Sequence, residues 1–154
     1  MTPATNILER ILQLVPGYSG YADRQAQRRS DTRLRTRIAR ELLHCEAVIQ
    51  SRLHTHLDGH DKDLLMELEH CRRMLNTLTA RIRYAPLGTS GMTSEKRLAE
   101  TELNEILRRD MQLLEFAAGL SERIDEMATR DIITVVDRIH HMLEERNEYI
   151  REFN

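Results

Sequence analysis

Apolar residues recur every three or four positions along most of the chain, which is the spacing of one face of a helix. The longest such stretch, residues 21–57, contains no Gly or Pro to interrupt a helix. A helix of this length, about 55 Å, needs partners along its whole apolar face. The face consists of Leu34, Ile38, Leu42, Cys45, Ile49, Leu53 and His56.

Turn signals divide the following residues into two more helices. Residues 58–59, an Asp-Gly pair, predict a turn before a helix at residues 61–84. Residues 85–92 are rich in Gly and Pro and predict a loop. Thr93 or Ser94 can then cap a fourth helix, because a hydroxyl accepts a hydrogen bond from a free main-chain N–H group.

A short amphipathic helix is predicted at residues 6–15, before the long one, and residues 16–17, a Pro-Gly pair, end it. Tyr18 and Tyr21 lie in the turn that follows. Two tyrosines in a glycine-rich turn either form a binding surface or pin the turn to the body of the protein. The second interpretation is favoured.

The boundary between the fourth and fifth helices has two candidate positions. Gly119 can take the left-handed conformation that ends a helix, and Ser121 can cap the next one. The alternative break lies at residues 129–131. We favour Gly119, which predicts a fifth helix of more than 30 residues that ends near Glu152.

These elements predict an all-α fold, an antiparallel up-down four-helix bundle preceded by a short helix, in one domain spanning residues 1–154. Helices two and five are the longest, and their overhanging ends meet at one end of the bundle. Residues 16–40 hold seven Arg against two Asp. The overhang of helix five offers Glu144, Glu145, Glu148 and Glu152 as their partners.

A two-helix extension cannot bury a full core, so its apolar residues are expected to stay partly exposed and to bind a partner or a second copy. This predicts self-association or partner docking through residues 18–34 and 142–153. The predicted interaction surface consists of Tyr18, Tyr21, Arg28, Arg29, Tyr149, Ile150 and Phe153.

Composition narrows the function classes. The formal net charge of -2 disfavours general nucleic-acid binding, although the Arg-rich residues 24–40 leave an anion or RNA binder open as an alternative. Cys45 and Cys71 fall on apolar faces and are interpreted as small core residues in a reducing compartment. No apolar run is long enough for a membrane span and no secretory signal is recognisable, so a cytoplasmic location is expected.

Two Glu-x-x-His pairs have the spacing used in di-iron bundles, Glu41 with His44 and Glu67 with His70. A turn near Gly59 brings positions whose numbers sum to about 118 to the same level. The two pairs then miss each other by about 10 Å. Both histidines also point away from the apolar stripes, so we predict no buried metal there.

The turn after the long helix carries a second group of potential ligands. His and Asp suit Zn²⁺ or Ni²⁺, which makes a metal-binding bundle an alternative function. The candidate ligands are His54, His56, Asp58 and His60.

Two charged residues fall on apolar faces, Asp110 on helix four and Arg146 on helix five. A buried charge needs a partner. The two can pair directly only if the helix break lies near Arg130, and they cannot if it lies at Gly119.

The segment Pro16-Gly17-Tyr18-Ser19-Gly20-Tyr21, followed by Asp23-Arg24 and Arg28-Arg29, resembles a stretch of small, uncharacterised bacterial helical proteins. The resemblance covers residues 16–40 and implies only a bacterial, all-helical protein. No nucleophile–base pair, phosphate-binding loop or dinucleotide fingerprint is present in the sequence. We therefore expect a non-enzymatic bundle without a cofactor that binds a protein partner or forms a homo-oligomer.

Overall fold

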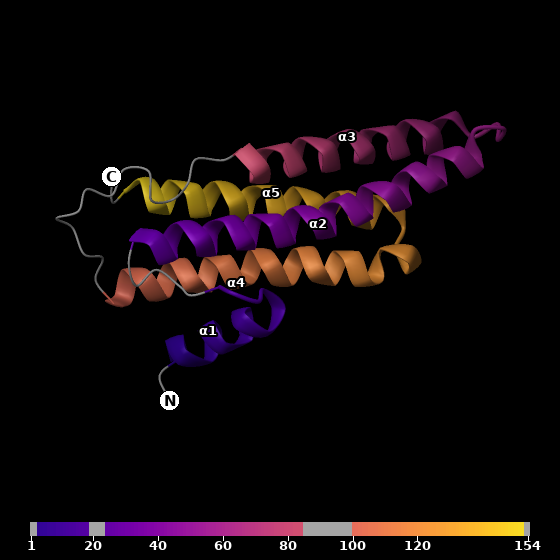
Figure 1. Cartoon of the computed structure of the whole chain (residues 1–154). Helices are drawn as coiled ribbons and strands as arrows, with labels where there is room; N and C mark the ends of the chain where they lie inside the picture. The colour runs from indigo at the N-terminus through magenta and orange to yellow at the C-terminus, as the bar shows by residue number, and fades with distance from the viewer. Residues whose placement is uncertain (1–2, 19–23, 85–99, 153–154) are drawn as a thin grey trace.

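A computed structural model describes residues 3–18, 24–84 and 100–152, and these residues form helices and turns with no strand (Figure 1). The all-α prediction is therefore confirmed. None of the helices in these ranges has the length and apolar content needed to cross a membrane. The elements are α1 (Pro3–Leu14), α2 (Arg24–His56), α3 (Lys62–Tyr84), α4 (Glu100–Arg123), the 3₁₀ turn η1 (Ile124–Glu126) and α5 (Thr129–Arg151).

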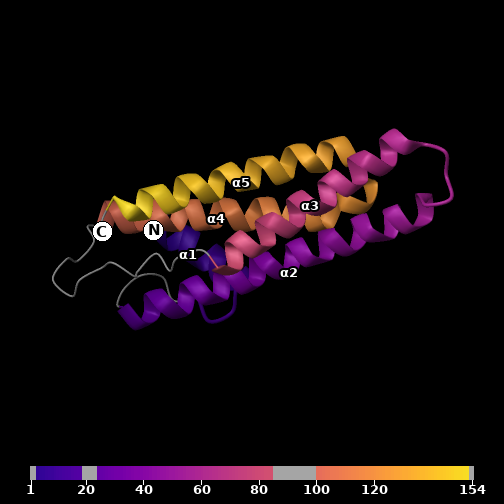
Figure 2. The same cartoon turned by 90° about the horizontal axis from the view of Figure 1, so that it is seen from above.

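The four long helices pack as two antiparallel hairpins, α2 with α3 and α4 with α5 (Figure 2). Across the bundle, α2 lies beside α4 and α3 lies beside α5, and the helices of each of these pairs run in the same direction. At the first contact, Arg52 of α2 donates to the carbonyl of Ile124 in η1, directly after the end of α4, at 2.6 Å. Arg81 of α3 marks the second, with an ion pair to Glu144 of α5 at 2.9 Å.

The apolar stripes predicted from the sequence converge on a single core. Cys45 and Cys71 are both fully buried in it as free thiols, as predicted. Burial raises the pKa of the Cys45 thiol to about 12 and that of Cys71 to about 11, so both stay protonated near neutral pH. They act as small apolar residues.

The N-terminal helix α1 starts at Pro3, three residues before the predicted start. Proline suits the first turn of a helix, because its missing N–H group would have no partner there and its φ is already helical. The helix packs on the outer face of α4 (Figure 1). Gly17 ends the segment with φ +86, in the left-handed region that glycine tolerates best.

The predicted helix break at Gly119 is wrong. Gly119 lies inside α4, which continues to Arg123, and the chain turns through η1 and the extended residues Met127 and Ala128. A glycine inside a helix costs only about 1 kcal/mol. One further turn of α4 buries Leu120 and Ile124 completely, which outweighs that cost.

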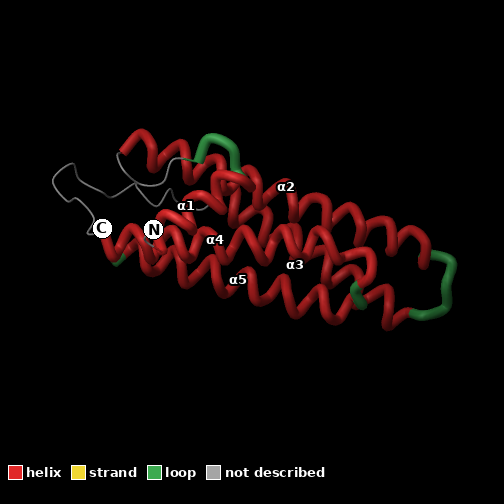
Figure 3. The backbone as a smooth tube through the Cα atoms, turned by 90° about the horizontal axis from the view of Figure 1, so that it is seen from below, coloured by secondary structure: helices red, strands yellow, loops and turns green. Residues whose placement is uncertain are grey.

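The later break also corrects the predicted extension. With 23 residues α5 matches α3, so helix five does not run past 30 residues. The start of α2 and the end of α5 do lie at the same end, but α4 lies against both, so they form no two-helix extension (Figure 1). Instead the α2–α3 hairpin projects beyond the α4–α5 turn at the opposite end (Figure 3).

Neighbouring positions on α2 test this packing, since Leu42 is 0 % exposed and Leu43 is 41 % exposed. We expect Leu42→Ala to lower the free energy of unfolding by about 2–5 kcal/mol, through lost burial and a residual cavity. The matched control Leu43→Ala should change it by less than about 0.5 kcal/mol. Urea denaturation measures both, and equal losses would contradict the observed face of α2.

Candidate functional site

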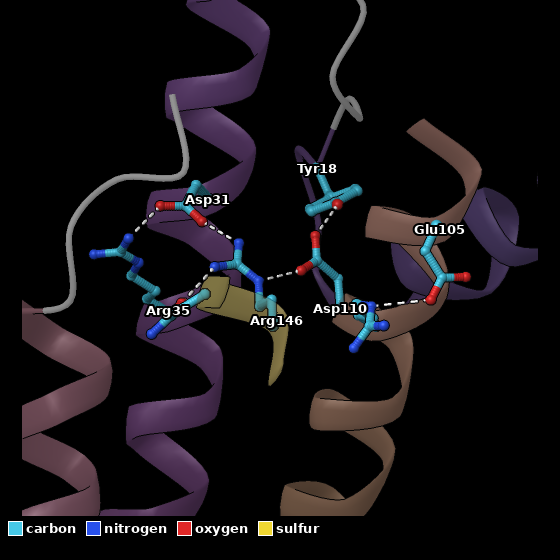
Figure 4. A network of polar contacts seen from close by, with 8 residues as sticks. Tyr18, Asp31, Arg35, Glu105, Asp110 and Arg146 are labelled. Carbon is cyan, nitrogen blue, oxygen red and sulfur yellow. Dashed lines mark hydrogen bonds and ion pairs between the residues drawn. The ribbon is translucent and has the colours of Figure 1, made fainter. Parts of the chain in front are cut away.

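A buried ionic network links three helices at one end of the bundle (Figure 4). Arg146 of α5 lies between two carboxylates. Its Nε donates to Asp110 Oδ1 of α4 at 2.6 Å, and its Nη2 donates to Asp31 Oδ1 of α2 at 2.5 Å. All three side chains are almost completely buried. The two negative charges share one guanidinium, and Arg35 supplies a second positive charge through Asp31 Oδ2 at 2.7 Å.

Tyr18 completes the network from the segment after α1. Its hydroxyl donates to Asp110 Oδ2 at 2.7 Å, and the side chain is 1 % exposed (Figure 4). Tyr18 thus pins the turn to the bundle, as the favoured sequence interpretation held. It is not part of an open interaction surface, which corrects its place in the predicted one.

The other residues of the predicted interaction surface differ in their exposure. Ile150 is buried at the end of α5, which packs against α4, so it does not form an exposed patch. Tyr149 is half-buried, with the guanidinium of Arg109 4.9 Å from its ring centre. Arg29 is exposed. The side chains of Tyr21, Arg28 and Phe153 lie outside the described residues.

The glutamates of α5 pair with other helices than predicted. Glu144 binds Arg81 of α3 at 2.9 Å, and Glu145 lies 4.0 Å from Arg109 of α4. Neither of these ion pairs involves the arginines of α2, because α2 and α5 lie diagonally across the bundle.

Three of the α2 arginines are engaged within the chain instead. Arg33 and Arg37 bind main-chain carbonyls of the α1 segment, and Arg37 also pairs with Glu41 at 2.8 Å. Arg35 binds Asp31. These bonds leave less of the arginine-rich stretch available for an anionic partner.

A polar groove of about 500 Å³ opens where the α2–α3 hairpin projects past the α4–α5 turn. Leu64 and Leu68 of α3 supply its apolar part. His56 lines it at a core position of α2, yet is exposed, because α4 and α5 end before reaching that level. The remaining lining residues are Arg52, Glu67, Asp125, Ala128, Thr129 and Arg130.

The structure does not assemble the predicted metal ligands at this end. His54, His56, Asp58 and His60 are all exposed. Within the described part of the chain, no three His, Cys, Asp or Glu residues lie together in a way that could hold a metal ion.

The histidines of the two Glu-x-x-His pairs lie on exposed faces, as predicted from their helical positions, whereas Glu41 and Glu67 are half-buried. His44 and His70 are both exposed, and Glu41 is occupied by its ion pair with Arg37. Glu67 lines the polar groove at the projecting end, one turn away from His70.

A second groove, of about 330 Å³, lies between α3 and α5 and is lined by both helices, including His70, Asp137 and His140. Arg81 contacts both His140 Nε2 and Glu144 Oε1. Burial, with the nearby Arg81 charge, lowers the pKa of His140. The neighbouring His141 is exposed, and its bond to the Asp137 carbonyl raises its pKa.

Sequence reasoning identified Asp110 and Arg146 and the condition under which they pair. It missed Asp31 and the projecting hairpin. Asp31 lies four residues before Arg35, a helical ion-pair spacing that looks like ordinary surface charge. Its position three residues before Leu34, on the apolar stripe, was the available signal.

Comparisons with known proteins give no relative from which a role of these residues could be inferred. The sites are therefore interpreted from their own geometry. No protein-family model matches the chain, and neither curated proteins nor solved structures include a significant match.

The network predicts a large effect of removing its central charge. Arg146→Met leaves Asp31 and Asp110 buried without the guanidinium between them, and should cost about 3–5 kcal/mol of unfolding free energy. Arg108→Met is the matched control, because its ion pair with Glu105 lies at the surface and should contribute no more than about 1 kcal/mol. Similar losses in the two variants, measured by urea denaturation, would contradict the network's role.

The two adjacent histidines predict opposite pH effects. The folded state binds a proton at His140 less readily than the unfolded state, so stability from this residue is present above pH 6.5 and is lost as the pH falls through the lowered pKa. His140→Gln should therefore flatten the fall of the melting temperature between about pH 8 and about pH 5. His141→Gln should steepen it, because the raised pKa of His141 stabilises the fold at low pH.

Proposed function

We propose that this protein is a non-enzymatic helical scaffold that binds a protein partner through its projecting α2–α3 hairpin. The single observation that carries the proposal is the exposure of two large apolar side chains there. Leu57, in the turn, is 60 % exposed, and Met66, on α3, is 70 % exposed. Leu57 directly follows α2 and Met66 lies in the first two turns of α3, at the end where the hairpin projects beyond the α4–α5 turn.

The groove beside this hairpin supports the same function. The half-buried Leu64 and the buried Leu68 line it together with charged residues of both signs. An apolar centre within a polar rim is the usual composition of a protein–protein interface. Methionine is also favoured at binding surfaces, because its flexible side chain adapts to different partner shapes.

The alternatives have weaker support. An anion or RNA binder would use the arginine-rich part of α2, where Arg33, Arg35 and Arg37 are engaged in hydrogen bonds and ion pairs within the chain. A metal-binding bundle would use the exposed histidines around the α2–α3 turn, which the structure leaves apart. Binding of a protein partner requires neither the α2 arginines nor the histidines of the turn to change their positions.

The proposal predicts that the hairpin no longer binds its partner when its exposed apolar side chains are replaced by charged ones. The double variant Leu57→Asp, Met66→Asp should abolish capture of a specific protein from extracts of the native host, identified by mass spectrometry. Leu43→Asp is the matched control, because Leu43 is also exposed but lies away from the turn, near the middle of α2. It should retain capture at the wild-type level.

Circular dichroism establishes that all variants remain helical, and light scattering reports whether the captured species is a second copy. A protein that binds the wild type and the double variant equally would place the interface elsewhere.

A further inference from the structure

The segment from α1 to Tyr18 packs against the four-helix bundle from outside and adds Ile11, Val15 and Tyr18 to its core. α1 lies on the outer face of α4, away from the axis around which α2 to α5 pack (Figure 1). Ile11 and Val15 are buried in this contact, and Ile7 and Leu8 are half-buried beside them. The outer face of α4 thus presents a binding site for one amphipathic helix.

The polar contacts of this site recognise the end of a helix rather than particular side chains. Arg33 Nη1 donates to the main-chain carbonyl of Pro16 at 3.0 Å, and Arg37 Nη1 donates to that of Leu14 at 3.2 Å. Leu14 is the last residue of α1, and the last carbonyls of a helix lack partners within it, so Arg37 satisfies a group that any helix of this length offers. Pro16 lies in the turn that follows, which Arg33 holds in place. A side-chain ion pair, Arg10 with Glu115, adds to them.

Tyr18 reaches the buried ionic network of the bundle, and the ion pairs of that network do not depend on it. Asp110 accepts hydrogen bonds from both Tyr18 and Arg146, so it keeps its ion pair when Tyr18 leaves. Departure of residues 3–18 therefore removes apolar contacts and hydrogen bonds of that segment while leaving the ionic network of the bundle paired.

We propose that the site on α4 also binds residues 3–18 of a second copy, so that two chains associate by exchanging this segment. A second copy is the occupant because its segment offers every group that the site binds. These groups are the apolar face with Ile11 and Val15, the two carbonyls and the Tyr18 hydroxyl. Exchange of an identical element creates no new interface and gives a closed two-fold dimer. This site is formed by α4 and by Arg33 and Arg37 in the first half of α2, away from the projecting end of the hairpin, so the inference does not depend on the proposed function.

A labelled peptide of residues 1–18, added to the full chain and followed by fluorescence anisotropy, tests the exchange. In the wild type the chain's own segment competes for the site. Tyr18→Phe in the chain removes its hydrogen bond to the Asp110 carboxylate while the peptide keeps its own, so the peptide should bind about tenfold more tightly than to the wild type. Tyr84→Phe is the matched control, since Tyr84 is 83 % exposed, and should bind like the wild type.

Gly17→Ala provides a second variant that leaves the buried hydroxyl in place. A Cβ there would lie 2.6 Å from the guanidinium carbon of Arg33 and meet an unfavourable φ, so it loosens the chain's own segment and should also strengthen peptide binding. An Ile11→Asp peptide should not bind. Light scattering of the wild type should show a dimer that grows with concentration and is lost in Ile11→Asp.

Unchanged peptide binding in both Tyr18→Phe and Gly17→Ala would overturn the exchange. So would a wild type that stays monomeric at every concentration while the peptide binds, because the occupant would then be another protein's helix.

Discussion

A guanidinium with no access to water must have its charge compensated, and this requirement governs how the helices of this protein meet. Arg146 is buried with Asp110 on one side and Asp31 on the other. Sliding α5 by one turn would move the guanidinium by about 5 Å and break its buried ion pairs with both Asp110 and Asp31. Apolar stripes alone tolerate such shifts, so the network selects one register among several that the core would accept.

Much of the fold could be predicted because apolar spacing and turn residues act locally. Both ends of α3 were predicted to within one residue, since Asp61 caps its first turn and Leu68, Cys71 and Leu75 define its buried face. The end of α4 could not, because Gly119 carries a local stop signal that a nonlocal gain overrides. Leu120 and Ile124 are buried only because other helices meet them.

The predicted candidate sites depended on the boundary between α4 and α5. The position of the break decided whether Asp110 could reach Arg146, and it also decided which end of the bundle would carry exposed apolar groups. With the break at Gly119 the end of α5 would project, whereas with the observed break it is enclosed and Leu57 and Met66 are exposed at the other end. The role of Tyr18 depends on its contact with Asp110, which is 92 residues away in the sequence. No local sequence pattern indicates such a contact.

The arrangement of the bundle as two hairpins has a consequence for the order in which it assembles. Each hairpin is closed by a short turn and so makes its contacts early, whereas the ion pair between the hairpins joins positions 115 residues apart. Before they dock, each hairpin can already neutralise its own acid, Asp31 with Arg35 and Asp110 with Arg146. Docking then brings together two surfaces whose charges are balanced in advance, so no isolated ion has to leave water on the way to the native state.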